Sequence, residues 1–364
     1  MCRSIRACLN FVLLLLLTVF TSCHKDPPVF KRMGYKDTVF TNYFKRTTGW
    51  VAGDGAYSVG LSNGQSLWLF GDSYIDSYDS ATKTVPWLFQ VHNAALLMGL
   101  QNPGNQLTLP GNQGGKNYFV HGNEPGYTMW PGAGYQDGDT AFVFVSKLWN
   151  GLHPDSFFIA KILLKDYSLR GFAPIPALNG ISVASAIVRE SDYCYVYGIR
   201  KNGYGNDLFV MRFPAHDFYK SWEYFDGNSW EKSVNNIRPI HNEFTASFNV
   251  CKIKNKYVLI TTEFSVGCDQ GKNIYVAVSD RPEGPFSNQH SIWELDDYLH
   301  GHLPFFYLAN PHPEYDNGKQ ELLITYCINT YAPCLPPYTN GRMDPDIYRP
   351  KAIRVPYKYI DPGL

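Results

Sequence analysis

Charged side chains are scarce in this sequence. Asp, Glu, Lys and Arg make up 18% of the 364 residues, below the roughly 25% of typical soluble domains. The 32 basic and 32 acidic residues give a net charge of zero with His neutral, and removing residues 1–22 leaves 30 basic against 32 acidic residues, a net charge of −2. No basic patch stands out, which argues against nucleic acid as a partner.

Cysteine and the motifs of several enzyme classes are also sparse or missing. After Cys23 the sequence has an odd number of cysteines and no CxxC spacing, so a zinc site is not expected: Cys194, Cys251, Cys268, Cys327 and Cys334. We predict buried thiols for the first two and for Cys327, while Cys268 and Cys334 lie in predicted loops and could pair. The sequence contains no P-loop, no GxGxxG after a strand and no HExxH, and GLSNG at residues 60–64 matches GxSxG only within the turn of a predicted hairpin, not at a strand-to-helix elbow.

The first residues read as a targeting segment. Arg3 and Arg6 precede an apolar run over residues 9–20 that is too short to span a bilayer as a mature helix. The Thr-Ser-Cys sequence that ends at Cys23 resembles a bacterial lipoprotein signal with a relaxed lipobox. We therefore predict that residues 1–22 are a signal peptide and that Cys23 carries lipid. The alternative is ordinary signal-peptidase cleavage nearby, with Cys23 lost or free.

A lipidated Cys23 predicts the location of the protein. The His-Lys-Asp sequence after it resembles the short charged signal that sends Bacteroidota lipoproteins to the cell surface. We expect a tether over residues 23–34 and an outer-membrane lipoprotein, on the cell surface or facing the periplasm.

Aromatic residues, by contrast, are plentiful at 16%, which suits β-structure and also suits stacking on sugar rings. Short aromatic and β-branched runs alternate with Gly, Asn, Asp and Pro turns, and no long amphipathic helix or linker interrupts them. Three-strand clusters recur over residues 49–100, 117–169, 182–213, 245–286 and 305–356. We predict an all-β, five-bladed β-propeller over residues 35–364, a single domain and a monomer, with residues 38–44 as an outer strand of the last blade. A β-sandwich is the alternative.

Residues 49–72 form the most informative stretch, a predicted β-hairpin with acids at both ends. Strands are expected over residues 56–61 and 66–70, joined by a Ser-Asn-Gly-Gln turn. Asp54 lies between two glycines before the first strand, and Asp72 follows a glycine after the second. Because glycine lets other groups approach the backbone closely, both acids are candidates for chemistry, although Asp is also common in ordinary turns.

Several motifs together resemble two known families. They are the hairpin GDGAYSV…LWLFGDS, the sequences VHN, MWPG and YVYG, the run SDRPEGPF, and NPHPE at residues 310–314. The chain resembles the Bacteroidota families catalogued as domains of unknown function 5005 and 4185. Those families are similar to five-bladed propeller glycosidases such as arabinanases and β-xylosidases, and some members of the second are associated with endo-D-arabinanase activity.

Glycoside hydrolysis needs two carboxyl groups, one ionised and one protonated, on either side of the scissile bond. In a propeller the candidates are acids on or just before the inner strands. Asp54 precedes the inner strand of blade one, and Glu243 precedes that of blade four, across the ring. We expect Asp54 to stay ionised as base or nucleophile and Glu243 to hold the proton, with Asp72 orienting a partner or raising its pKa by charge repulsion. A turn acid or a solvated loop acid is the simpler explanation for each.

Five further residues are candidates for binding a glycan: His92, Asn93, Trp130, His312 and Arg349. Trp130 lies beside Pro and Gly at a strand end, which suits a sugar platform or rim packing. In related propellers a histidine often faces the central channel, sometimes with calcium or another ion, so His92 and His312 are either channel residues or hydrogen-bonded core residues. Arg349 could reach a substrate or close the ring.

Two classes of function remain open at this point. The first is a surface-anchored glycoside hydrolase that acts on a complex, furanose-containing or arabinan-like glycan through paired carboxylates. The alternative is a non-catalytic glycan-binding lipoprotein on the same propeller, and a pure protein-interaction scaffold would not need the hairpin acids. No cofactor is predicted for either of the first two apart from a structural calcium or other ion in the central channel. The sugar, the linkage, exo or endo action and the stereochemistry are not readable from the residues.

Overall fold

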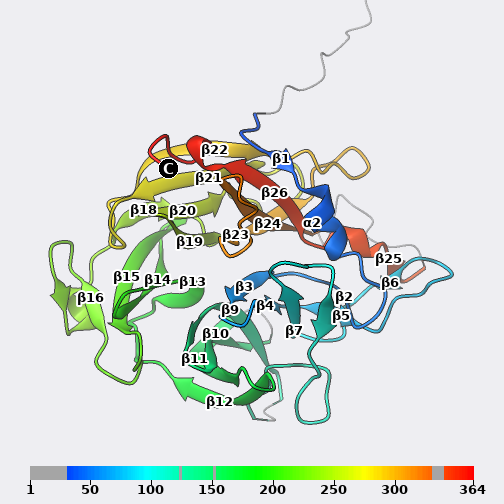
Figure 1. Ribbon diagram of the computed structural model, residues 1–364, viewed down its shortest axis with the longest axis horizontal. Helices are drawn as coiled ribbons and strands as arrows, with labels where there is room; N and C mark the ends of the chain where they lie inside the picture. The colour runs from blue at the N-terminus through cyan, green and yellow to red at the C-terminus, as the bar shows by residue number, and fades with distance from the viewer. Residues whose placement is uncertain (1–30, 123–124, 151–152, 330–339) are drawn as a thin grey trace, which may run out of the picture. The chain divides into compact units, whose positions relative to one another are not determined.

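The computed structural model describes residues 31–122, 125–150, 153–329 and 340–364. Residues 31–364 form one structural unit. Its large sheets follow one another around a centre in chain order, as the colour sequence in Figure 1 shows. The predicted all-β, five-bladed β-propeller is confirmed.

Each blade is an antiparallel sheet, and its innermost strand, which is named first below, lies next to the centre of the ring. From blade one to blade five, each innermost strand contacts that of the next blade. Blade one contains β3 (Tyr57–Gly60), β4 (Gln65–Phe70), β7 (Ala94–Gly99) and β8 (Gln106–Thr108). Blade two contains β9 (Tyr127–Asp137), β10 (Thr140–Trp149), β11 (His153–Leu163) and β12 (Ser168–Pro174). Blade three contains β13 (Ser182–Glu190), β14 (Tyr193–Asn202), β15 (Gly205–Pro214), β16 (Glu223–Phe225), β17 (Trp230–Glu231) and β18 (His241–Phe244). Blade four contains β19 (Phe248–Ile253), β20 (Lys256–Thr262), β21 (Asn273–Ser279) and β22 (Ser287–Glu294), and blade five contains β23 (Phe305–Pro311), β24 (Glu321–Asn329), β26 (Lys351–Pro356) and β1 (Tyr35–Lys36).

Neighbouring blades are held together by apolar side chains from facing sheets. Successive side chains of a strand point to opposite faces. In β4, Leu67 and Leu69 pack toward blade two, whereas Trp68 and Phe70 pack toward blade five. Both faces of a blade are thus buried, which explains why these strands are continuously hydrophobic rather than alternating.

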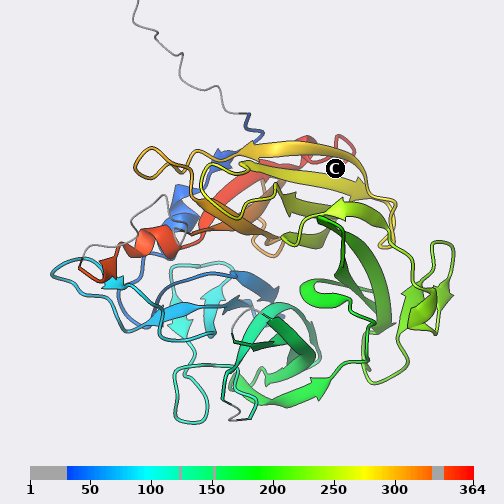
Figure 2. The same cartoon turned by 180° about the vertical axis from the view of Figure 1, so that it is seen from behind.

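The ring closes through the N-terminal strand. β1 pairs with β26, with Tyr35 opposite Arg354, so the start of the chain completes the sheet formed by its end. Figure 2, the view from behind, shows the same blue and red segments side by side. The pairing covers the outer edge of β26 with a two-residue strand.

The predicted outer strand over residues 38–44 is wrong, because this segment forms helix α2 (Thr38–Tyr43). Asp37 caps the helix by accepting a hydrogen bond from the backbone N–H of Phe40 at 2.8 Å. The same helix buries Phe40 and Phe44 against Trp68. Packing of these two rings therefore outweighs the strand propensity of the Thr-Val-Phe-Thr run.

The remaining elements are short. They are the pairs β2 (Trp50–Gly53) with β5 (Ser73–Ile75) and β6 (Val85–Pro86) with β25 (Arg342–Met343), and the 3₁₀ helices η1 (Val234–Asn236), η2 (Pro345–Tyr348) and η3 (Tyr357–Tyr359). Among the described residues, no helix has the length and apolar character needed to cross a membrane. The predicted signal peptide and Cys23 lie outside the described residues. The last part of the predicted tether does contact the propeller, since the backbone N–H of Met33 donates to the carbonyl of Ile292 at 2.9 Å.

The cysteines follow the sequence interpretation where they are described. Cys194, Cys251 and Cys327 are buried free thiols. Cys268 is disulfide-bonded, and Cys334, the loop cysteine considered as its partner, lies outside the described residues.

Candidate functional site

Two aspartates lie side by side at the end of a short ladder. β2 and β5 pair up to Gly53 and Ser73. Beyond that point the backbone N–H of Asp54 donates to the carbonyl of Asp72 at 3.2 Å, and the N–H of Gly71 donates to the carbonyl of Asp54 at 2.9 Å. A Cβ at Gly71 would lie 2.5 Å from Oδ1 of Asp54. The glycine is therefore required for the Asp54 carboxyl to lie where it does.

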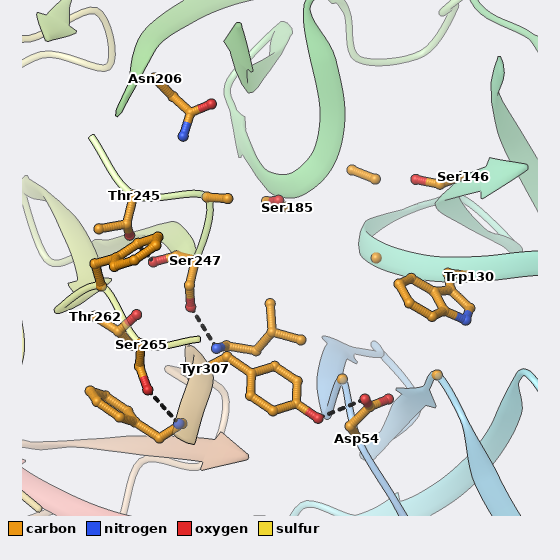
Figure 3. Close-up of a pocket in the computed structure, with 18 of the residues that line it drawn as sticks. Asp54, Trp130, Ser146, Ser185, Asn206, Thr245, Ser247, Thr262, Ser265 and Tyr307 are labelled. Carbon is orange, nitrogen blue, oxygen red and sulfur yellow. Dashed lines mark hydrogen bonds between the residues drawn. The ribbon is translucent and has the colours of Figure 1, made fainter. Parts of the chain in front are cut away.

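Asp54 is held by two tyrosines. The hydroxyls of Tyr307 and Tyr348 both donate to its Oδ2, at 2.8 Å and 3.0 Å, and Figure 3 shows the first of these bonds. Burial and the negative charge of Asp72 raise the pKa of Asp54 from 3.8 to about 7, although the two hydroxyl donors act in the opposite direction. We expected an ionised base, whereas this carboxyl holds its proton close to neutral pH.

Asp72 is buried and linked to two side chains that the sequence had singled out. Its Oδ1 accepts hydrogen bonds from Nδ1 of His92 at 3.0 Å and from the indole N–H of Trp130 at 3.3 Å. Asp72 therefore connects Asp54 with an imidazole and an aromatic ring in one contiguous group.

This group lies where two cavities meet. The central cavity, about 580 Å³, is lined by residues from blades one to five, and the side cavity measures about 730 Å³. Asp54, Trp130 and Tyr307 line both cavities. Asp72, His92 and Tyr348 line the side cavity, together with the aromatic rings of Phe89, Tyr127 and Phe305. Both volumes are in the range of small-molecule sites, roughly 300–1,000 Å³.

Small hydroxyl side chains surround the central cavity. Figure 3 places Asp54 and Trp130 on one side and Thr245, Ser247 and Thr262 on the opposite side. The hydroxyl of Ser247 accepts from the backbone N–H of Leu308 at 2.6 Å, which fixes the segment that carries Tyr307. The wall thus offers several neutral hydrogen-bonding groups beside the carboxyls of Asp54 and Glu263.

Two irregular inner strands shape the same cavity. The register of β13 shifts between Ser182 and Ala186, and that of β23 shifts between Tyr307 and Asn310. Ala184 and Leu308, which lie within these shifts and line the cavity, have positive φ angles of 104° and 52°. Bulges and strained backbone of this kind re-aim side chains and concentrate at functional sites.

Three of the predicted binding residues are structural, which corrects their assignment. Asn93 is 1% exposed, and its amide bonds to backbone groups of Phe119 and Met129. His312 is also 1% exposed and bonds to Ser58 and Thr325; burial, followed by the charge of Arg354, lowers its pKa to about 3.

Arg349 is the third structural residue. It donates to the carbonyls of Val51 and Arg46 and pairs with Asp346. Its side chain thereby joins the C-terminal part of the chain to the N-terminal part, which is the second of the two roles considered for it.

The second predicted catalytic acid does precede the inner strand of blade four, since β18, which carries Glu243, is followed by β19. The sequence did not indicate that β18 also pairs with β15 of blade three. The side chain of Glu243 lies outside what the structure describes. The neighbouring Thr245 lines the central cavity, so the backbone at Glu243 runs close to its wall.

Sequence reasoning missed three residues of the site, namely Tyr307, Tyr348 and Glu263. Glu263 follows β20 and lines the central cavity. Burial acts to raise its pKa, but hydrogen bonds from the backbone N–H of Lys272 and from Asn273 outweigh burial and hold the pKa below its usual range. A carboxyl at the end of a hydrophobic strand was the available signal, the same one that identified Asp72.

The described residues were also compared with the requirements of a metal site. Within the described ranges, no group of three or more His, Cys, Asp or Glu side chains is arranged to hold a metal ion. The channel ion considered from the sequence therefore has no identified ligand set among these residues.

Comparisons with known proteins place the chain in a family. The model described as "Domain of unknown function (DUF5005)" matches residues 37–358, and no functionally curated protein matches the chain. A Bacteroides ovatus protein provisionally described as a hydrolase superposes with a TM-score of 0.71 at 20% identity, over 92% of this chain and 97% of its own. This likeness shows the fold.

Two glycosidases are more distant. An exo-β-1,3-galactanase from Phanerochaete chrysosporium has a TM-score of 0.47 at 10% identity, over 90% of this chain and 63% of its own. An α-L-arabinofuranosidase from Clostridium thermocellum has a TM-score of 0.44 at 14% identity, over 86% and 91%. Neither score supports an argument about chemistry. Because the family model spans nearly the whole propeller, the chain belongs to the DUF5005 family.

Proposed function

We propose that this protein is a glycoside hydrolase in which Asp54 is the general acid. The observation that carries the proposal is the Asp54 carboxyl, which lies between two cavities beside a second carboxyl and has a pKa raised to about 7. A general acid must hold a proton at the working pH and release it to the leaving oxygen. Paired carboxyls whose environments push their pKa values apart are the usual means of achieving this.

The lining of the cavities supports a neutral glycan as the substrate. Hydroxyl side chains such as Ser185 and Thr262 line the central cavity, while Trp130 and Phe305 offer rings to the apolar faces of sugars. The family resemblance of the sequence favours a furanose-containing, arabinan-like polymer among such glycans.

The acid needs a second group that assists attack on the anomeric carbon. Asp72 is next to Asp54, and Glu243 keeps its candidacy from the sequence because its backbone runs close to the wall of the central cavity. Glu263 joins them as a carboxyl with a lowered pKa on the same cavity. Substituting each acid in turn will identify which of them assists the attack.

The test is a panel of plant, algal and bacterial polysaccharides, read out by the sugars released. On a cleaved glycan, Asp54→Asn should lower the rate at least ~100-fold, the low end for a positioned acid or base. Glu243→Gln and Glu263→Gln are compared with it, and Asp280→Asn, an exposed acid paired with Lys256, is the matched control. Binding of a glycan without hydrolysis by the wild type would instead support the non-catalytic alternative, and unchanged activity of Asp54→Asn would refute the assignment.

The location is proposed from the sequence. We propose that Cys23 is lipidated and anchors the protein to the outer membrane, where the propeller would meet polymeric glycans. The apolar run ending in Thr-Ser-Cys supports this.

A further inference from the structure

The side cavity adjoins a third, smaller cavity. The small cavity measures about 80 Å³ and is lined by residues drawn from 92–93, 117–122 and 127–129. His92, Tyr127 and Thr128 line both cavities. A group held in the small cavity would therefore be adjacent to the side cavity and to the Asp72–His92 pair.

Two residues that line the small cavity carry a buried polar atom without a partner among the described residues. Nδ1 of His121 and the hydroxyl of Thr128 are shielded from solvent and make no hydrogen bond to the part of the chain that the structure describes. Both residues line the small cavity. Buried polar groups are nearly always satisfied by protein or by ordered water. Water occupies roughly 30 Å³ in the liquid, so the volume suffices for about two molecules.

The bond between His92 and Asp72 fixes which ring nitrogen is available. A carboxylate only accepts hydrogen bonds, so Nδ1 of His92 carries the proton that bridges the 3.0 Å to Oδ1 of Asp72. In the neutral imidazole, the form a general base requires, Nε2 is then the acceptor nitrogen, and in the described part of the chain it has no hydrogen-bond partner. The His92 side chain is 39% exposed, so it can reach a ligand while Asp72 holds its orientation.

We propose that the small cavity is a bound-water site and that His92 is the general base that activates water from it for hydrolysis in the side cavity. This inference rests on the proposed function. Oxygen of the water attacks the anomeric carbon while Nε2 of His92 takes one of its protons. The glycosidic C–O bond breaks, and Asp54 protonates the departing oxygen. The proton on His92 then passes to solvent, and Asp54 takes one back, which restores both groups.

The arrangement predicts inversion at the anomeric carbon, because water attacks from the side opposite to the leaving group. His92→Gln, which can still donate a hydrogen bond to Asp72, should lower kcat at least ~100-fold with little change in KM. His92→Ala should regain activity with added imidazole, a response that a merely structural histidine would not show. His216→Gln is the matched control, because Nδ1 of His216 lies 2.7 Å from Oδ1 of Asp137 on the outer surface, in the same kind of pair.

The possible outcomes distinguish a failure of the proposed function from a failure of the role proposed for His92. If no glycan is hydrolysed by the wild type, the proposed function fails and this inference fails with it. If the wild type is active and Asp54→Asn is not, but His92→Gln stays within threefold of the wild type or the product retains its configuration, only the role of His92 is refuted.

The water site has its own test that needs no substrate. A high-resolution crystal structure of the full chain should show ordered water bonded to Nδ1 of His121 and to the hydroxyl of Thr128. Thr128→Val keeps the shape of the side chain and removes the hydroxyl, so it should lose the water at that position and lower kcat several-fold. An empty small cavity in the wild type would overturn the proposal.

Discussion

Replacing Asp54 by Asn should make the fold more stable at neutral pH. The carboxyl is largely buried beside the charge of Asp72, and its pKa is raised from 3.8 to about 7. Asn has nearly the same shape and its carbonyl oxygen can still accept from Tyr307 and Tyr348. The substitution therefore removes an unfavourable charge without removing the two hydrogen bonds that hold the side chain.

The direction of this effect follows from the number of protons bound in the folded and in the unfolded chain. Between pH 4 and 7 the folded chain keeps the Asp54 proton while the unfolded chain has lost it, so unfolding releases a proton and becomes more favourable as pH rises. At about 1.4 kcal/mol for each pKa unit, the rise from 3.8 to about 7 corresponds to an upper limit of about 4 kcal/mol. Partial solvent contact and the shared charge with Asp72 reduce this, and we expect about 1–3 kcal/mol.

Urea unfolding followed by tryptophan fluorescence between pH 4 and 8.5 measures the effect. The free energy of unfolding of Asp54→Asn should match that of the wild type near pH 4 and exceed it increasingly up to pH 7, then stay constant. Asp280→Asn, at an exposed acid, should not show this growing difference. A variant that is less stable than the wild type at pH 8, or a difference independent of pH, would refute the account of the Asp54 site.

Three further predictions address the same chain. Tyr307→Phe removes a donor that lowers the pKa of Asp54, so the pKa should rise and the alkaline limb of kcat/KM against pH should move to higher pH; an unchanged limb would contradict the acid role. Gly71→Ala places a Cβ 2.5 Å from Oδ1 of Asp54, so it should lower the free energy of unfolding in a urea melt by about 1–3 kcal/mol and remove most of the activity. Gly115→Ala is the control, because its Cβ would have its nearest contact at 3.6 Å, and it should change neither the stability nor the activity. Cys23→Ala should release the protein from the membrane fraction into the soluble one, and unchanged fractionation would exclude the lipid anchor.

The local sequence pattern was sufficient to predict the blades and to single out the two aspartates. The Asn-Gly turn and its flanking hydrophobic runs predicted strands close to β3 and β4, because turn chemistry and hydrophobicity are properties of neighbouring residues. The glycines beside Asp54 and Asp72 also indicated close approach of other groups, and Gly71 shows why they are needed.

Local pattern could not identify the partners of Asp54. Tyr307 and Tyr348 are 253 and 294 residues away in the sequence and reach the carboxyl only because the ring closes. The shift in register at Leu308 that helps to position Tyr307 also depends on pairing with a second strand. The same limit explains Asn93 and His312, since whether a polar side chain faces a cavity or the core is decided by packing between blades.

The structure separates what stabilises the propeller from what this site requires. The apolar clusters between neighbouring blades bury rings such as Trp68 and Phe209 away from the central cavity. At the cavity itself, the protein keeps a carboxyl beside a second charge and holds Ala184 and Leu308 at positive φ, each of which lowers stability. Such costs persist when the surroundings over-determine the geometry, as the tyrosine, serine and backbone bonds around Asp54 and Leu308 do here. Destabilising features that are kept at the wall of a cavity support the proposal that this site is retained for chemistry.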